Sequence, residues 1–191
     1  NQRLGFLSTP QSGSSLAEGE HGFEIRKEVV DIEICRQLSP ALQKWLTEFR
    51  SLKWPISRGS LRLRVSPLGE RGVWLDFANI DIKHLLESRT ELAEAMQMAH
   101  VEIGQKRKSL VQKTEGLKLV DPVLRPWFET WSVLHSRPIP LYCTVGSFTQ
   151  TGFLANRILV ETVINLARDL GVQKFAEFGS GIGNFTLPLA E

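Results

Sequence analysis

Hydrophobic and polar positions follow two periods along the chain, and each period predicts a different kind of element. Between Leu42 and Phe49 the apolar side chains recur at i, i+3, i+4 and i+7, a spacing that gathers them on one face of a helix. Ser39 is a favoured N-cap and Pro40 a favoured first helical residue. The sequence therefore predicts a helix that begins near residue 40.

Residues 60–65 alternate strictly between polar and apolar, and the largely apolar segment 72–77 follows after a turn that contains Pro67 and Gly69. The two segments predict a β-hairpin. Arg62 and Arg64 share one face of it, because side chains two apart on a strand point the same way. That face is either a solvated outer surface or a contact for RNA phosphates.

The rest of the chain up to residue 145 carries weaker patterns for secondary structure. The segment through about residue 20 contains the small polar runs Ser8-Thr9-Pro10 and Gly13-Ser14-Ser15, which predict a loop. Four prolines between 116 and 140 indicate irregular or edge structure. The spacing of leucines and alanines predicts a helix over 81–98. Strands are expected at 23–34, 100–103 and 141–145.

The last 45 or so residues carry the most specific pattern: a helix over 153–170, a short apolar strand over 172–178, and then the loop 179–185 with three glycines. Glycine permits close approach of backbone to a ligand, and a following helix N-terminus offers free N–H groups. Glu177, just before the glycines, suits a cationic sulfonium and a ribose better than a pyrophosphate. We place a domain boundary near residue 145.

The spacing of the glycines separates this loop from other nucleotide loops. A dinucleotide fingerprint needs glycine where this chain has Asn184, and a phosphate loop needs a Lys after the glycines. What remains is acid-x-G-x-G-x-G, the commonest methyltransferase loop. A glycine turn that joins a strand to a helix and binds nothing is the alternative.

Two flanking motifs are more specific than the glycines. Phe148-Thr149-Gln150 precedes the helix, and Gly183-Asn184-Phe185-Thr186-Leu187-Pro188-Leu189-Ala190 follows the strand. This pair resembles the RNA uracil-C5 methyltransferases, which use S-adenosyl-L-methionine (SAM) to make 5-methyluridine in tRNA and rRNA. The resemblance implies that Gln150 and Asn184 contact SAM, beside a loop formed by Glu177, Gly179, Gly181 and Gly183. Asn156 also falls where many members have Asn.

The chain departs from that family at two positions. Members usually have Leu-aromatic-Cys after the acid, where this chain has Phe178-Gly179-Ser180, and often Asn where it has Gly152. The resemblance also implies covalent chemistry, in which a Cys thiolate adds to C6 of uracil and a Glu later removes the C5 proton. In the family both lie downstream of the glycine loop. We therefore expect no catalytic residue here and interpret the chain as an inactive fragment of a longer enzyme.

The resemblance extends more faintly to the N-terminal part, where Gly22-Phe23 and Val29 to Cys35 are similar to a segment of the family's central domain. In some members that Cys is the fourth ligand of an iron–sulfur cluster. One thiolate cannot hold a cluster that needs four. We therefore expect no metal, and Cys35 is interpreted as a small buried residue rather than an iron–sulfur ligand.

These observations predict an α/β protein in which an α+β central domain (1–145) precedes the first part of a Rossmann-like methyltransferase domain (146–191). The expected cofactor is SAM and the expected partner is RNA, tRNA or rRNA, rather than DNA. Two alternatives remain open: a SAM-dependent methyltransferase of another substrate class, and a non-catalytic RNA-binding module with a methyltransferase-like fold.

Composition changes this picture little. The 191 residues are 42% hydrophobic and 23% charged, with a formal net charge of +2, which is too small to indicate nucleic acid by itself. Residues 105–108 with Lys113 are the densest basic cluster and predict either a phosphate contact or a charged turn. Two dissimilar cysteines, and the absence of a long apolar run or a signal-peptide pattern, favour a cytoplasmic protein.

Overall fold

The computed structural model describes residues 4–7, 29–52, 59–77, 81–87, 89–150 and 152–191. The chain forms two compact units, 1–38 and 39–191. In the first unit, β1 (Gly5–Leu7) pairs antiparallel with β2 (Val29–Asp31). Residues 5–7 of the expected loop over 1–20 therefore form a strand instead, and the strand expected over 23–34 is seen only from residue 29 to 31. Residues 8–28 lie outside the described part of the chain.

The second unit contains a five-stranded mixed sheet with the order β3-β4-β5-β6-β7. The predicted hairpin is confirmed: β3 (Ser60–Val65) pairs antiparallel with β4 (Arg71–Asp76). β5 (His100–Ile103) runs parallel to β4, and β6 (Lys108–Lys113) and β7 (Gly116–Val120) continue the sheet antiparallel. Together with its helices, this sheet confirms the expected α/β class.

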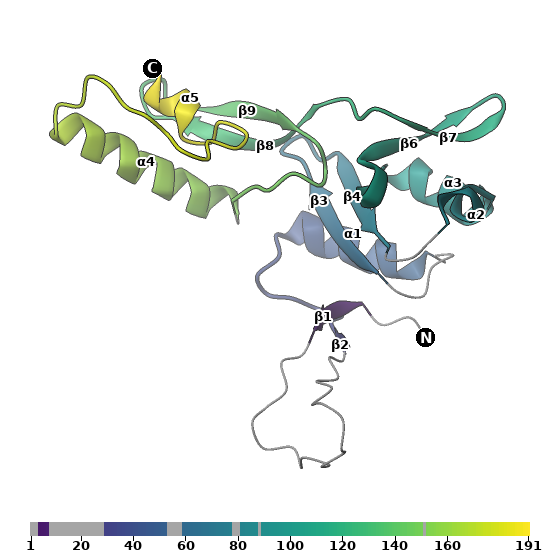
Figure 1. The fold of residues 1–191 in the computed structure, drawn as a ribbon. Helices are drawn as coiled ribbons and strands as arrows, with labels where there is room; N and C mark the ends of the chain where they lie inside the picture. Colours follow the sequence, from purple (N-terminus) through teal and green to yellow (C-terminus); the bar gives the residue numbers. More distant parts are fainter. Residues whose placement is uncertain (1–3, 8–28, 53–58, 78–80, 88, 151) are drawn as a thin grey trace, which may run out of the picture. The chain divides into compact units, whose positions relative to one another are not determined.

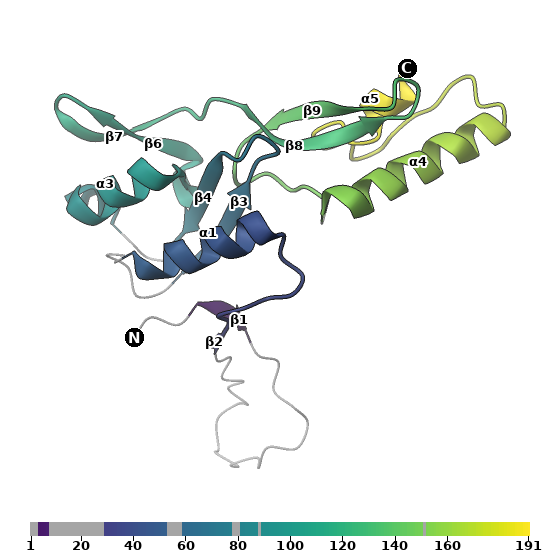
Figure 2. The ribbon, with the colours of Figure 1, turned by 180° about the vertical axis from the view of Figure 1, so that it is seen from behind.

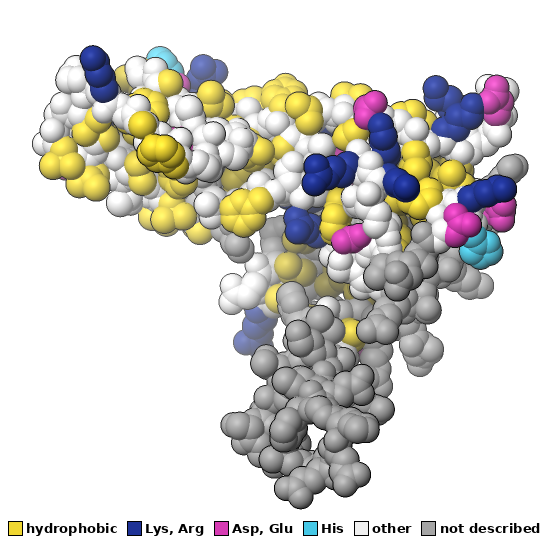
Figure 3. Space-filling view, viewed as in Figure 1, with side chains coloured by type: hydrophobic (Ala, Val, Ile, Leu, Met, Phe, Trp, Pro, Cys, Tyr) yellow, Lys and Arg dark blue, Asp and Glu magenta, His cyan; other side chains and the backbone are white. Residues whose placement is uncertain are grey.

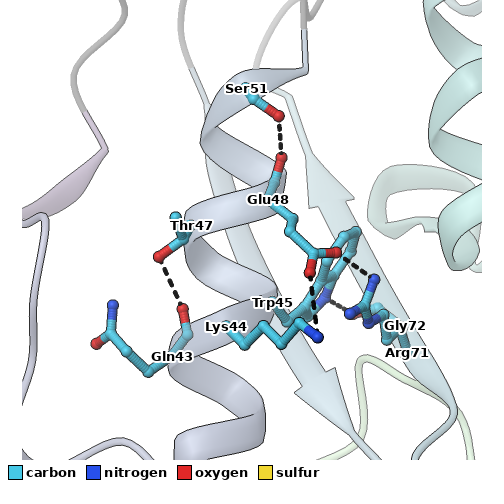
Figure 4. Close-up of polar contacts among 8 residues, drawn as sticks. All are labelled: Gln43, Lys44, Trp45, Thr47, Glu48, Ser51, Arg71 and Gly72. Carbon is cyan, nitrogen blue, oxygen red and sulfur yellow. Dashed lines mark hydrogen bonds and ion pairs between the residues drawn. The ribbon is translucent and has the colours of Figure 1, made fainter.

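Helix α1 (Pro40–Ser51) forms as its sequence predicts, with the Ser39 hydroxyl accepting a hydrogen bond from the backbone N–H of Leu42 at 3.3 Å. It lies across β3 and β4, behind the sheet in Figure 1 and in front of it in Figure 2. Trp45 is fully buried, and its Nε1 donates to the carbonyl oxygen of Gly72 in β4 at 3.3 Å (Figure 4). This buried hydrogen bond fixes the helix on the sheet.

Two helices connect β4 to β5 where the sequence predicts one: α2 (Ile82–Glu87) and α3 (Arg89–Met98), with residue 88 outside the described part. A parallel pair of strands needs such a crossover connection. Leu85, Leu92 and Ala95 are buried and form the inward face of these helices.

The segment 116–140 is more regular than the prolines suggest, since it contains β7, β8 (Arg125–Ser132) and most of β9 (Arg137–Cys143). β8 and β9 pair with each other in a two-stranded sheet. Both are therefore edge strands, where proline is tolerated because one side of the backbone needs no ladder hydrogen bond. The prediction of edge structure is therefore right, and the prediction of irregular structure is wrong.

Helix α4 (Phe153–Asp169) and the short α5 (Thr186–Leu189) both contact β8. Figure 1 and Figure 2 show α4 running alongside the β8–β9 hairpin. α4 packs through Asn156, Val160 and Ile164. A second apolar stripe on the same helix is exposed to solvent and comprises Leu159, Val163, Leu166 and Leu170.

The strand predicted over 172–178 is wrong for this structure, in which these residues have no regular secondary structure. Val172, Phe175 and Phe178 are exposed, and the Phe178 side chain is 97% exposed. A strand is stable only when a neighbour pairs with it, and no other segment of the described residues pairs with this one. The apolar pattern of 172–178 is therefore typical of a strand, but the hydrogen-bonding partner that a strand needs is not among the described residues.

Candidate functional site

The three glycines of the loop all have a left-handed backbone conformation. Gly179, Gly181 and Gly183 have φ values of 74°, 58° and 85°, a region that side chains with a Cβ rarely adopt. The space around the Cα of Gly179 is open, with no heavy atom within 4 Å of where a Cβ would lie. Each turn of the loop therefore depends on glycine, and its first glycine is accessible to a ligand.

Asn184, directly after the loop, forms a reciprocal amide pair with Asn156 of α4. Its Nδ2 donates to Asn156 Oδ1 at 2.8 Å, and its Oδ1 accepts from Asn156 Nδ2 at 2.9 Å. Both side chains are buried, with Asn156 1% and Asn184 8% exposed. The backbone oxygen of Asn184 also accepts from the Thr130 hydroxyl of β8 at 2.6 Å. The loop is thus tied to both α4 and β8.

The other two expected contacts lie on either side of this pair. The Thr186 hydroxyl at the start of α5 donates to the Glu177 carboxylate, which brings the acid of the motif back toward the helix that follows the glycines. Gln150 lies after β9 and is half-buried, and its side chain makes no hydrogen bond to the described residues. The structure does not join Gln150 and Asn184 by a hydrogen bond, so their convergence on one ligand stays a prediction.

Arg62 and Arg64 do not form a bare outer face. The Arg62 guanidinium donates to the carbonyl oxygen of Gly146 at 2.7 Å, and the Arg64 guanidinium donates to that of Ser147 at 2.6 Å. Both acceptors belong to the turn that follows β9, more than 80 residues away along the chain. These arginines are therefore engaged with the protein itself, which argues against the RNA-phosphate interpretation.

The basic cluster lies at the connection between β5 and β6. Residues Gly104–Lys106 form one 3₁₀ turn, and Arg107 closes it in the left-handed conformation at φ 50°. Lys108 is paired with Asp121 at 2.6 Å. Lys106 and Arg107 are exposed and have no ion-pair partner within the described part of the chain. The β5–β6 turn thus presents two accessible cations, and Lys113 at the end of β6 is a third exposed cation of the cluster.

Figure 3 shows the charges gathered over the part of the molecule formed by the five-stranded sheet, while the surface over α4 is mostly apolar or uncharged. At the start of α4 lies a cavity of about 160 Å³. Among its lining residues are Asn156, Glu129 and Trp131, and the Arg157 guanidinium lies 3.8 Å from the centroid of the Trp131 ring. Burial raises the pKa of the Glu129 carboxyl above its usual value.

The described residues contain no group of three or more His, Cys, Asp or Glu side chains placed to hold a metal ion. Cys35 is half-buried, and Cys143 is buried in the core of the second unit. No described helix has the length and apolar character that crossing a bilayer requires.

The sequence analysis missed Glu102 at this site, and it noted Asn156 only through the resemblance, without a structural role. Glu102 is a carboxylate within the apolar strand β5, and it is 6% exposed. Asn156 interrupts an otherwise apolar stripe that continues with Val160 and Ile164. A polar residue on a predicted buried face is a usable signal, because such a group is seldom buried without a partner.

The comparisons with known proteins point to one relative. The chain is 48% identical over 176 residues to a protein of Bdellovibrio bacteriovorus described as an uncharacterized RNA methyltransferase. The match covers 91% of this chain and 45% of the relative, so the chain spans less than half of that protein's length. No protein-family model and no solved structure matches the chain.

Proposed function

We propose that this chain belongs to a SAM-dependent RNA methyltransferase that modifies C5 of a uridine in tRNA or rRNA. The observation that carries the proposal is the 48% identity to a protein described as an RNA methyltransferase. The Phe148-Thr149-Gln150 and Gly183-Asn184-Phe185 motifs add the finer assignment to uracil C5, through the family that they resemble.

The residues present fit the methyl donor. The glycine loop leaves its backbone accessible at Gly179, and Glu177 supplies a carboxylate of opposite charge to a sulfonium. When bound, SAM supplies the methyl group. Gln150, Glu177, the loop glycines and Asn184 would hold it, and the pairing of Asn184 with Asn156 would fix the loop.

Two features of the described residues support the expectation that the catalytic Cys and Glu belong to the remainder of a longer protein. The segment 172–178 has no pairing partner, and α4 exposes an apolar stripe from Leu159 to Leu170. Both are surfaces that further strands of a doubly wound sheet would cover. We therefore assign no catalytic residue within residues 1–191.

The proposal predicts that Gln150→Ala weakens binding of S-adenosylhomocysteine, the product of methyl transfer, by about tenfold, the equivalent of one hydrogen bond of about 1.4 kcal/mol. Titration calorimetry measures the effect. Gln173→Ala, at an exposed glutamine after α4, is the matched control and should leave the affinity unchanged. Absence of binding to the unaltered longer protein would refute the cofactor assignment.

A second measurement, made on the longer protein, tests which base the enzyme methylates. Incubation with methyl-labelled SAM and uridine-containing RNA, followed by nucleoside analysis, should give 5-methyluridine. Labelled product on another base would favour a methyltransferase of another class. RNA binding without methyl transfer would favour the non-catalytic RNA-binding module.

The two accessible cations of the β5–β6 turn are the proposed RNA contact. Lys106→Gln with Arg107→Gln should weaken RNA binding about equally for all sequences and reduce the slope of log K against log salt by about 1–2, because each phosphate contact releases counterions. Lys44→Gln on α1, whose side chain is 72% exposed, is the matched control. An unchanged salt slope would place the phosphate contacts elsewhere.

A further inference from the structure

We propose that Arg64 and Glu102 are positioning residues for the cofactor motif: from the five-stranded sheet, they hold residues 143–149 in one conformation and thereby fix where Gln150 meets the methyl donor. This inference rests on the proposed function and adds to it two residues outside the motifs. In the rest of this subsection, residues 143–149 are called the tethered turn.

Arg64 lies in β3 and reaches the tethered turn at several points. Its guanidinium donates to the carbonyl oxygen of Ser147 at 2.6 Å, to that of Thr144 at 3.4 Å and to the Thr149 hydroxyl at 3.3 Å. It also lies 3.6 Å from Cys143 Sγ. A planar guanidinium with five fixed N–H donors suits several acceptors at once. Because Thr149 directly precedes Gln150, the hydrogen bond from Arg64 to the Thr149 hydroxyl fixes the chain next to Gln150.

Glu102 holds the same turn from β5. One carboxylate oxygen accepts the backbone N–H of Val145 at 2.9 Å and the other accepts that of Gly146 at 3.1 Å. The residue is 6% exposed, and a buried carboxylate is tolerated only when it is paired and hydrogen-bonded. Arg64 provides the opposite charge nearby. Arg64 therefore binds carbonyl oxygens of the turn, and Glu102 binds its N–H groups.

Neighbouring side chains further restrict the conformation of the tethered turn. The Arg62 guanidinium lies 4.9 Å from the centroid of the Trp74 ring and donates to the carbonyl oxygen of Gly146. The Trp74 ring packs so closely on Gly146 that a Cβ there would lie 2.4 Å from it. Within the turn, the backbone N–H of Thr144 donates to the Ser147 hydroxyl at 3.2 Å. Contacts from three charged side chains and one indole thus fix a segment of seven residues.

Burial strengthens this arrangement. It lowers the pKa of the Arg64 guanidinium and raises the pKa of the Cys143 thiol, so at neutral pH the arginine is still charged and the cysteine stays protonated. Arg64 therefore directs its hydrogen bonds to neutral acceptors of the turn, and Glu102 is the buried carboxylate that acts on its charge among the described residues. A binding segment that is ordered before the ligand arrives loses less entropy on binding, which increases affinity.

The test uses Arg64→Lys, which keeps the charge and loses the planar fork, and Glu102→Gln, which keeps the shape and loses one acceptor. Hydrogen exchange without ligand should show the amides of Val145 and Gly146 exchanging at least tenfold faster in both variants. Affinity for S-adenosylhomocysteine should fall about tenfold. Arg168→Lys and Glu115→Gln, at exposed positions of α4 and of the turn before β7, are the matched controls and should change neither quantity.

If Glu102→Gln fails to fold, Thr149→Val still tests the proposal, because it removes only the Arg64 acceptor next to Gln150. Faster exchange with unchanged affinity would overturn the positioning role while leaving the proposed function intact. Unchanged exchange in Arg64→Lys would overturn the tether itself. If the unaltered longer protein binds no S-adenosylhomocysteine, the proposed function fails and this role fails with it.

Discussion

Asn156→Leu and Asn184→Leu should each lower the free energy of unfolding by about 1–3 kcal/mol, the cost of leaving a buried amide without its partner. The two amides donate to each other at 2.8 and 2.9 Å, and both are buried. In the double variant both polar groups are absent. Its destabilisation should therefore be smaller than the sum of the two single effects, and urea titration of the four proteins measures the coupling.

Asn165→Leu is the matched control, because this residue is on the same helix but exposed. It should change stability by less than about 0.5 kcal/mol. Additive effects of Asn156→Leu and Asn184→Leu would contradict a mutual pair. Loss of S-adenosylhomocysteine affinity in Asn184→Leu with no loss of stability would show that this amide serves the ligand instead of the loop.

The elements that the sequence predicts well are those whose cause is local. α1 has its cap, its proline and its apolar stripe within a dozen residues, and the β3–β4 hairpin needs only alternation and a turn. α4 likewise follows from helical spacing. In each case the residues that decide the structure are close together in the chain, so the pattern is sufficient.

The elements that the sequence misjudges depend on distant partners. β9 contains two prolines, and among the described residues it pairs with β8 alone, so its strand character depends on a partner that the local pattern does not show. Residues 172–178 show the opposite error, since they have a strand pattern without a partner among the described residues. Strand formation is decided by pairing, which a local pattern does not contain.

The same division applies to the candidate site. The glycines are predictable because each meets a requirement of its own backbone, a positive φ. The tether of Glu102 to Val145 and Gly146 spans 43 and 44 residues, and the Asn156–Asn184 pair spans 28. No spacing rule connects such residues. A charged or amide side chain within an apolar run indicates that a partner exists, without indicating which.

Trp127→Ala should lower the free energy of unfolding by about 3–5 kcal/mol, the cost of removing a large aromatic side chain from a packed core. Trp127 is 1% exposed and forms a cluster with Cys143 and Val145. Ile182 of the glycine loop packs against this cluster. The substitution should therefore loosen the loop as well as the core, and thermal unfolding together with hydrogen exchange over 179–185 measures both.

Trp127→Phe separates packing from polarity at the same position. Trp127 Nε1 is buried and has no hydrogen-bond partner within the described residues, so phenylalanine loses volume but also removes an unpaired donor. Trp127→Phe should therefore lower the free energy of unfolding by less than about 2 kcal/mol.

Trp131→Ala is the comparison at a half-buried tryptophan of the same strand, and it should lower the free energy of unfolding by about 1–2 kcal/mol. Equal destabilisation by Trp127→Phe and Trp127→Ala would show that the Nε1 group has a partner, and that the indole holds the glycine loop through a hydrogen bond instead of through packing.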